Sequence, residues 1–362
     1  MRILFDHQTF HIQRFGGISR YFYELINRLS DDDVSVALSF SMNRYIKHHP
    51  KCSHTNVTKK LFKVTEGVFR RLNKKNSLSK IAKGDFDLFH PTYYDPYFLN
   101  ALGDKPFVLT IHDMMHERFA QYFKADDPTA GYKRLLAQKA RRIIAISENT
   151  KRDIIEILGV DEAKIDVVYH GFDSKTVVEG RPEGLPEEYI LYVGERRCYK
   201  NFDSTVTAFM EVRKTHPDCH LVLTGRKLSS AERRQFERFG LTDFVKIYTD
   251  ISDDVLLQLY RHARLFVYPS LYEGFGIPIL ESFSQQCPVV LSNASCFPEV
   301  AGDAAEYFDP MDAQAQAAAM LAVMDSEEHR NELTKAGASR LKLFTWDNTV
   351  KKTREVYKKV LL

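Results

Sequence analysis

Short apolar runs alternate with segments of helical periodicity along most of the chain. The first run, residues 3–5, leads through Gly16 and Gly17 to apolar residues at positions 18, 22, 25, 26 and 29, a spacing typical of a helix. Further strands are predicted at residues 34–40, 86–90, 106–113, 143–147 and 165–169, and helices at 132–142 and 149–158. Strands that alternate with helices predict parallel sheets covered by helices on both faces.

The pattern breaks between residues 171 and 188, where glycines and prolines alternate with charges, and this predicts a linker. The alternation then resumes. Strands are predicted at 189–194, 220–225, 244–248, 264–268, 288–292 and 304–309, helices at 202–215 and 252–260, and a turn at 297–302. The chain ends in a helix with Thr345 or Asp347 as its N-cap. We therefore expect two α/β domains, residues 1–180 and 181–345, followed by a C-terminal helix, 346–362.

Composition and charge limit the classes of protein that fit this sequence. With 362 residues, 44% hydrophobic and 27% charged, the chain is typical of globular proteins. A net charge of +3 does not indicate nucleic-acid binding, and no apolar run approaches the roughly 18 residues of a membrane span. Asp6 interrupts the N-terminus, which has no signal-peptide pattern, and the five cysteines have no C-x-x-C spacing. We expect a cytoplasmic protein with reduced thiols.

One segment departs from this balance. Residues 44–83 contain twelve Lys and Arg residues and a single acid, Glu66, with apolar residues interleaved between positions 61 and 72. Such a pattern predicts an amphipathic basic helix that lies on the inner, anionic face of a membrane. A solvated insertion fits the same composition, and the sequence leaves both interpretations open.

The strongest candidate site follows the strand at 264–268. Glu273, Gly274 and Gly276 lie in a turn, and Pro278 suits the first turn of the next helix. Free N–H groups and the helix dipole would make this turn an anion site. Glu273 and Glu281 flank this anion site. The sequence also fits a simpler interpretation, in which Glu273 is a solvated loop residue and Glu281 only complements the helix dipole.

Other strand ends carry candidate groups too. Gly16 and Gly17 fit a second phosphate-binding loop or a plain turn, and His112 ends a strand, where ligands of open α/β sheets bind. Arg196, Arg197 and Lys200 lie between a strand and a helix, as cations that neutralise a diphosphate would, or as ordinary solvated charges. Neither glycine loop has the G-x-G-x-x-G spacing, which disfavours a dinucleotide-dependent oxidoreductase.

Taken together, these motifs resemble those of a known family. The set comprises E-G-F-G-I-P-I-L-E at 273–281, P-V-V-L-S at 288–292, P-E-V-A-G-D-A-A at 298–305, V-G at 193–194 with Arg196 and K-N at 200–201, I-A-I-S at 144–147, and G-G-I at 16–18. In this order they resemble glycosyltransferase family 4, retaining enzymes of the GT-B fold. The resemblance implies two Rossmann-like, doubly wound parallel-sheet domains that face each other across a cleft, with the C-terminal helix crossing back to the first domain.

The resemblance also implies roles for individual residues. Glu273 would contact the transferred sugar at the reaction centre, and His112 would contact the donor sugar from the first domain. The donor-binding residues it implies are Gly16, Gly17, Arg196, Lys200, Phe275, Gly276, Ile277 and Glu281. Arg196, Lys200 and the loop at 275–277 would bind the diphosphate, and Glu281 the ribose.

The implied reaction is transfer of a hexose, with GDP-mannose as the expected donor, to a saccharide or lipid-linked glycan in cell-surface polysaccharide synthesis. No Asp-x-Asp triplet lies at a strand end, so we expect no metal and no other cofactor. A UDP-sugar transferase, an epimerase, a phosphorylase or a non-catalytic nucleotide-sugar sensor remain alternatives. Gln286 departs from the family, which commonly has glycine there, and this puts the nucleotide fit in question.

Overall fold

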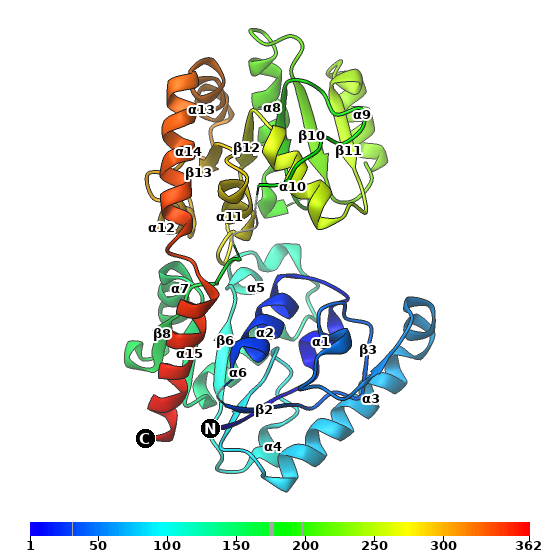
Figure 1. Ribbon diagram of the computed structural model, residues 1–362, viewed down its shortest axis with the longest axis vertical. Helices are drawn as coiled ribbons and strands as arrows, with labels where there is room; N and C mark the ends of the chain where they lie inside the picture. The colour runs from blue at the N-terminus through cyan, green and yellow to red at the C-terminus, as the bar shows by residue number, and fades with distance from the viewer. Residues whose placement is uncertain (31, 174–176, 197) are drawn as a thin grey trace. The chain divides into compact units, whose positions relative to one another are not determined.

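The computed structural model describes residues 1–30, 32–173, 177–196 and 198–362. It divides into two compact units, Met1–Gly171 with Thr345–Leu362, and Phe172–Phe344. The division thus falls at the start of the segment in which we expected the linker, nine residues before the expected boundary at 180/181. Figure 1 shows the strands and helices of both units. None of the described helices is long and apolar enough to cross a membrane.

The first unit is built on parallel strands. They are β1 (Arg2–Phe5), β2 (Asp33–Val36), β5 (Leu88–His90), β6 (Val108–Ile111), β7 (Arg142–Ala145) and β8 (Ile165–Val167), with a separate pair, β3 (Phe40–Ser41) and β4 (Thr55–Asn56). Two three-stranded sheets, β2-β1-β5 and β6-β7-β8, are joined by a parallel bridge between Phe89 and Phe107. All of the pairs are parallel, as the alternating pattern predicted.

Helices of the first unit cover these strands. They are α1 (Gln8–Ile12), α2 (Gly17–Arg28), α3 (Lys59–Lys83), α4 (Leu99–Leu102), α5 (Met115–Arg118), α6 (Thr129–Lys139), α7 (Glu148–Leu158) and α15 (Trp346–Leu361). Three single 3₁₀ turns lie at Ile46–His48, Ala120–Tyr122 and Glu162–Lys164. Two expectations were wrong here. Helix α1 interrupts the glycine turn expected after β1, and residues 34–40 form a shorter strand because the chain leaves the sheet after Val36.

The C-terminal helix α15 belongs to the core of the first unit. Its Tyr357 hydroxyl lies 2.7 Å from His90 Nδ1, and Val350, Val356 and Val360 pack in the same cluster as Phe5 and other residues of β1. Thr345 caps it by accepting from Asn348 N. Gly171 lies so close to its start that a Cβ there would be 2.5 Å from Trp346 Cα, so only glycine fits.

The second unit has a single six-stranded parallel sheet in the order β11-β10-β9-β12-β13-β14. The strands are β9 (Tyr189–Tyr192), β10 (His220–Thr224), β11 (Val245–Tyr248), β12 (Leu265–Tyr268), β13 (Val289–Ser292) and β14 (Glu306–Phe308). From β9 the chain adds β10 and β11 on one side of the sheet, and it then adds β12, β13 and β14 on the other side. The strand order therefore switches between β9 and β12. Ligands of doubly wound sheets bind beyond the carboxyl ends of the strands at such a switch point.

Helices of the second unit are α8 (Phe202–Val212), α9 (Ser230–Arg238), α10 (Asp253–His262), α11 (Ile277–Ser284), α12 (Phe297–Ala301), α13 (Ala313–Asp325) and α14 (Glu327–Leu341), with 3₁₀ turns at Cys198–Lys200 and Thr242–Phe244. The turn expected at 297–302 was wrong, because Pro298 occupies the first turn of α12, where a missing N–H costs nothing. The helix predicted at 252–260 is present as α10, and Ser252 caps it by accepting from Val255 N.

Candidate active site

Two loops meet at the switch point of the second sheet. The loop after β9 carries Lys200, and the loop after β12 carries Glu273. Leu271 N donates to Tyr199 O at 2.7 Å, so the loops are hydrogen-bonded through their backbones. The alternation of strands and helices predicted both loops, but only the strand order makes them neighbours.

Lys200 and Glu273 form the centre of this arrangement. Lys200 Nζ donates to Glu273 Oε1 at 2.5 Å, and the two side chains are 16% and 11% exposed. The ammonium also lies 5.7 Å from the centroid of Tyr268, the last residue of β12. Burial, and then the charge of Glu273, raise the pKa of Tyr268 well above its ordinary value, so this phenol stays protonated.

The backbone of Glu273 is fixed independently of its side chain. Its N–H donates to Ser295 Oγ at 3.1 Å, and its carbonyl oxygen accepts from Ser295 Oγ at 2.6 Å. Ser295 itself has a φ of 57°, which a non-glycine residue adopts only at an energetic cost. The loop after β13 therefore holds the predicted catalytic carboxylate in position, and no sequence pattern had pointed to Ser295.

Helix α11 begins directly after this loop. Gly276, its N-cap, has φ of 90° and ψ of 52°, and a Cβ there would lie 3.1 Å from Ile279 Cδ1 and 3.2 Å from Phe297 Cε1. Glycine is therefore required both by conformation and by space. The first N–H groups of a helix lack intrahelical acceptors, and the helix dipole adds positive potential there. Ile277 begins the helix, and Phe275 before it is 3% exposed.

Glu281 lies one turn into α11, where its Oε2 accepts from the Tyr260 hydroxyl at 3.2 Å. Gln286, the residue that replaces the family's glycine, follows the other end of α11 and has a φ of 58°. An eight-residue helix is about 12 Å long. Gln286 thus places a non-glycine residue in a left-handed backbone conformation, and it is distant from the loop at 275–277.

Arg196 is engaged inside the protein. Its side chain is fully buried, with Nε donating to Glu232 Oε1 at 3.0 Å and Nη1 to Thr224 O at 3.1 Å, while Nη2 donates to Arg226 O. Burial opposes ionisation of Glu232, but hydrogen bonds from Ser229 and the charge of Arg196 outweigh it and lower its pKa. Arg196 therefore joins the loop after β9 to the loop after β10, and its fork does not point to open space. Arg197 lies outside the described residues.

The remaining predicted residues belong to the first unit. His112 follows β6, is 6% exposed, and its backbone N–H donates to the Tyr94 hydroxyl at 3.1 Å. Its Nε2 is buried without a hydrogen-bond partner in this structure. Burial above all, with His90 and Lys133 nearby, lowers the pKa of His112 to about 3. The imidazole is neutral, and its Nε2 is the type of atom that a sugar hydroxyl could satisfy.

Gly16 and Gly17 begin α2. A Cβ at Gly16 would lie 2.8 Å from Gln13 Oε1, the atom that accepts from Ser19 N and caps the helix. A Cβ at Gly17 would meet nothing within 4 Å. A side chain at position 16 would therefore have to displace the Gln13 amide from Ser19 N, whereas at position 17 the structure leaves open space next to the backbone.

One buried cation near His112 was not predicted. Lys133 in α6 is fully buried, and its Nζ donates to Asp113 O at 3.0 Å and to Glu117 Oε2 at 2.8 Å. It also lies 5.5 Å from the centroid of Tyr94, the residue that accepts from His112 N. Lys133 thus orders the turn that carries His112. Its position in a predicted helix gave no sign of this, because lysines on helices are usually exposed.

The described residues contain no group of three His, Cys, Asp or Glu side chains that could hold a metal ion. What the two units share is the arrangement of open, doubly wound α/β sheets with candidate groups at the carboxyl ends of their strands. Such a pair of units is the arrangement of the GT-B fold, and solved structures of that fold match nearly the whole chain.

Anabaena Alr3699/HepE in complex with UDP and glucose matches 99% of this chain and 100% of its own with a TM-score of 0.75 at 18% identity. Sucrose-phosphate synthase from Thermosynechococcus elongatus matches 99% of this chain and 98% of its own with a TM-score of 0.75 at 20% identity. At such identities these likenesses show the fold.

Sequence comparison defines the family. The family model described as Glycosyltransferase Family 4 matches residues 15–176, and the one described as Glycosyl transferases group 1 matches residues 176–340. O-antigen chain mannosyltransferase B of Escherichia coli is 30% identical over 291 residues, 76% of this chain and 74% of that protein. O-antigen chain mannosyltransferase RfbU of Salmonella typhimurium is 27% identical over 207 residues, 56% of this chain and 57% of that protein. The chain belongs to glycosyltransferase family 4, as its motifs indicated, and is a glycosyltransferase.

Proposed function

We propose that the protein transfers mannose from GDP-mannose to a saccharide or lipid-linked glycan acceptor, with retention of configuration and without a metal. The observation that carries the proposal is the Lys200–Glu273 pair at the switch point of the second sheet, beside the N-terminus of α11. The choice of mannose is supported by the 30% identity to an O-antigen chain mannosyltransferase.

The leaving group accounts for the cation. As the bond between the sugar C1 and the phosphate oxygen breaks, negative charge accumulates on the diphosphate. Lys200 and the N–H groups at the start of α11 would stabilise this charge, and such preorganised donors act without a metal. Arg196 would act indirectly, by holding the loop that carries Lys200.

Retention follows if the acceptor oxygen attacks C1 from the face that the phosphate leaves. In that step the new C–O bond forms as the C1–phosphate bond breaks, and the acceptor proton passes to the departing phosphate oxygen. Glu273 would contact the transferred sugar, and His112, as a neutral imidazole, would exchange a hydrogen bond with one of the sugar hydroxyls.

The test combines binding and turnover. A ligand that binds only the folded state stabilises it, by about 2.7 kcal/mol at 100-fold excess over its Kd. We expect GDP and GDP-mannose to raise the melting temperature more than UDP, ADP, their sugar conjugates or NAD. With octyl α-mannoside as the acceptor probe, we expect GDP release, an α-linked product by NMR, and an unchanged rate in EDTA.

Each alternative has its own outcome. A shift with UDP and UDP-glucose alone would replace GDP-mannose by a UDP-sugar, a choice supported by the fold's likeness to a protein solved with UDP. Turnover that needs inorganic phosphate would indicate a phosphorylase, and turnover of the donor without any acceptor an epimerase. Binding of GDP-mannose without turnover of any acceptor would indicate a sensor.

A further inference from the structure

A basic hollow lies in the first unit, where three segments meet. The α1–α2 loop contributes Arg14, the chain after β3 contributes Arg44 and Lys47, and the first turn of α3 contributes Lys59. The hollow has a volume of about 410 Å³. None of its lining residues is among the predicted donor-binding residues, and nothing in the proposed transfer uses it.

The positive charge of this hollow is not neutralised within the protein. None of its lining residues is acidic, and none of the four cationic side chains forms an ion pair with a carboxylate in the part of the chain that the structure describes. Arg44 instead lies 5.7 Å from the centroid of the exposed Phe15 ring. Cations gathered without counterions create a potential that attracts an anion.

The floor of the hollow is rigid. Asn43 is 1% exposed, its Nδ2 donates to Gln13 O at 2.7 Å, and its Oδ1 accepts from Tyr45 N at 3.0 Å. Ser41 Oγ donates to Phe10 O at 2.7 Å. The cations therefore extend from an ordered base, which lowers the entropy cost of holding them around a ligand.

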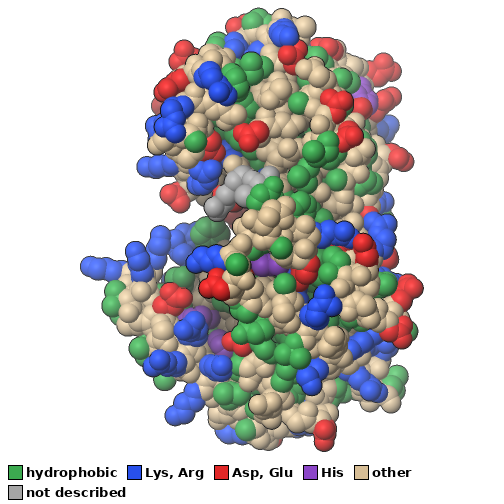
Figure 2. All heavy atoms as spheres, turned by 180° about the vertical axis from the view of Figure 1, so that it is seen from behind, with side chains coloured by type: hydrophobic (Ala, Val, Ile, Leu, Met, Phe, Trp, Pro, Cys, Tyr) green, Lys and Arg blue, Asp and Glu red, His purple; other side chains and the backbone are tan. Residues whose placement is uncertain are grey.

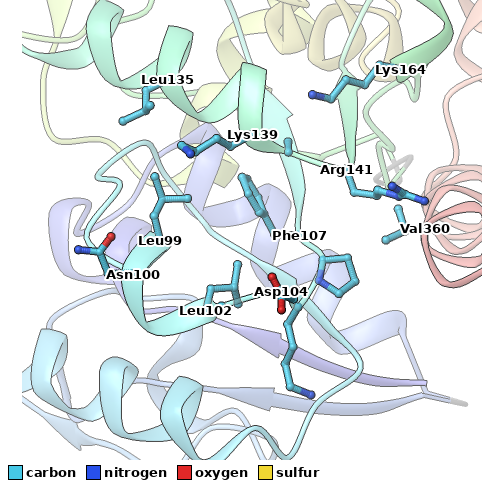
Figure 3. Close-up of a pocket in the computed structure, with 14 residues that line it drawn as sticks. Leu99, Asn100, Leu102, Asp104, Phe107, Leu135, Lys139, Arg141, Lys164 and Val360 are labelled. Atoms are coloured by element: carbon cyan, nitrogen blue, oxygen red, sulfur yellow. The ribbon is translucent and has the colours of Figure 1, made fainter.

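A second hollow, shown in Figure 3, makes a useful contrast. It lies at the amino ends of β6 and β7, has a volume of about 910 Å³, and also contains cations. There, however, Lys105 donates to Phe86 O, Lys164 donates to Ala137 O and Gln138 O, and Asp104 adds an acid. Two of its four cations thus donate to backbone carbonyls and an acid lies among them, so its net positive charge is smaller than that of the basic hollow.

An apolar stripe begins beside the basic hollow. Leu61, Val64, Val68 and Leu72 on α3 are 50%, 82%, 55% and 40% exposed, and their spacing of three and four residues places them along one side of the helix. The neighbouring side, about a quarter of the way around the helix, packs on the unit through Phe62 and Phe69. We call the four exposed residues the α3 stripe.

Cations flank the α3 stripe. Lys60, Lys63, Arg71 and Lys75 are exposed along the helix, which contains a single acid, Glu66. Figure 1 shows α3 along the outside of the unit, with its first turns extending beyond the strands. Figure 2 shows Lys and Arg side chains, with hydrophobic ones between them, on the lobe at its lower left.

We infer that this face docks on an anionic membrane, with the α3 stripe at the headgroup–acyl boundary and a lipid phosphate in the basic hollow. A helix with exposed apolar residues between cations lies in the plane of such an interface. Arginine and lysine bind phosphate oxygens through charge-assisted hydrogen bonds. A lipid surface supplies both the apolar layer and the phosphate, whereas a soluble phosphate would leave the stripe uncovered. Docking does not depend on the proposed sugar transfer and is measured separately from it.

The test is co-sedimentation of the full chain with vesicles. We expect binding to phosphatidylcholine vesicles that contain about 30% phosphatidylglycerol to exceed binding to pure phosphatidylcholine vesicles by about tenfold or more. Binding to the anionic vesicles should decrease when the salt concentration rises from about 0.1 to 0.5 M. The variant Arg44→Gln/Lys47→Gln/Lys59→Gln should lose about tenfold in binding or more, since each cation near an anionic surface contributes. Leu61→Ser/Val64→Ser/Val68→Ser should lose a similar amount at unchanged charge.

The matched control is Lys335→Gln/Lys342→Gln/Lys351→Gln, which removes the same charge from exposed positions in α14, at its C-cap and in α15. It should bind vesicles like the unmodified protein. Equal losses in the control would mean that net charge alone drives binding, and equal binding to both vesicle types would overturn the proposal, because zwitterionic phosphatidylcholine would then serve as well as an anionic surface. No vesicle binding, with stabilisation by inorganic pyrophosphate that the hollow variant abolishes, would assign the hollow to a soluble phosphate and overturn the membrane proposal.

Discussion

Lys200 Nζ lies 2.5 Å from Glu273 Oε1, and this ion pair joins the loops that follow β9 and β12. The two residues are 73 positions apart in the sequence. The cation expected to bind the donor diphosphate therefore has a carboxylate counterion before any donor arrives. When the diphosphate binds, the ammonium must be shared between two anions.

This sharing gives opposite predictions for the two partners. Lys200→Ala should weaken GDP binding about tenfold or more, because it removes a charge-assisted hydrogen bond. Glu273→Gln should leave GDP binding equal or tighter, since it frees the ammonium, yet lower transfer about 100-fold or more. Calorimetry with GDP and initial rates with GDP-mannose check both. Full transfer by Glu273→Gln would show that the reaction centre lies elsewhere.

For Arg196 we expect a stability effect. Arg196→Met removes one of the two arginines paired with Glu232, because Arg226 Nη2 also lies 3.0 Å from Glu232 Oε1, so it should cost less than the about 3–5 kcal/mol of a buried carboxylate left wholly unpaired. Glu232→Gln leaves the fully buried Arg196 guanidinium without its carboxylate and should cost more, and adding Arg196→Met should recover part of that loss. Urea unfolding measures all three. If Arg196→Met kept its stability and lost only GDP affinity, Arg196 would be a direct diphosphate ligand.

Lys133 should affect the reaction by holding His112 in position. Lys133→Met removes the ammonium that holds Asp113 O and Glu117, and should lower kcat more than it raises KM, since the imidazole loses its position. Adding Glu117→Gln removes the carboxylate left unpaired, so the double variant should regain part of the stability. An unchanged kcat in Lys133→Met would leave Lys133 a purely structural residue.

Buried histidines make stability depend on pH. Burial lowers the pKa of His90, His112 and His170 to about 3, whereas an unfolded chain protonates histidine near 6.5. Between these values the unfolded state binds more protons, so the free energy of unfolding falls as pH falls below about 6.5. Between pH 7 and 5 we expect a loss of up to about 2 kcal/mol per histidine. Denaturant unfolding at both pH values checks this, and equal stability would contradict it.

Gln286 offers a stabilising substitution. With φ at 58°, a glutamine there is strained by about 1–2 kcal/mol, although its Oε1 accepts from Arg261 Nη1 at 2.9 Å. Gln286→Gly should raise stability by about 0.5–1 kcal/mol, and Gln286→Val should lower it, because a β-branched residue tolerates positive φ least. Thermal unfolding distinguishes them. GDP binding should stay the same in both, since Gln286 follows the far end of α11 from Gly276.

The periodicity of the sequence was enough to predict strands and helices in both halves, because buried parallel strands are short apolar runs and covering helices repeat every three to four residues. It also placed Glu273 and Lys200 at strand ends, since a strand end is a local feature. Helices α13 and α14 were not predicted from the sequence.

The pairing of Lys200 with Glu273, the burial of Arg196 against Glu232, and the ammonium of Lys133 behind His112 all depend on which strands become neighbours. Strand order is set by packing over the whole sheet, so no local pattern reports it. The same holds for α3. The sequence left a membrane helix and a solvated insertion both open for its segment, and the fold decided which of its apolar residues are covered, by burying Phe62 and Phe69 and leaving the α3 stripe exposed. Which side of a helix meets the core is decided by the tertiary structure, because both sides here carry apolar residues at helical spacing.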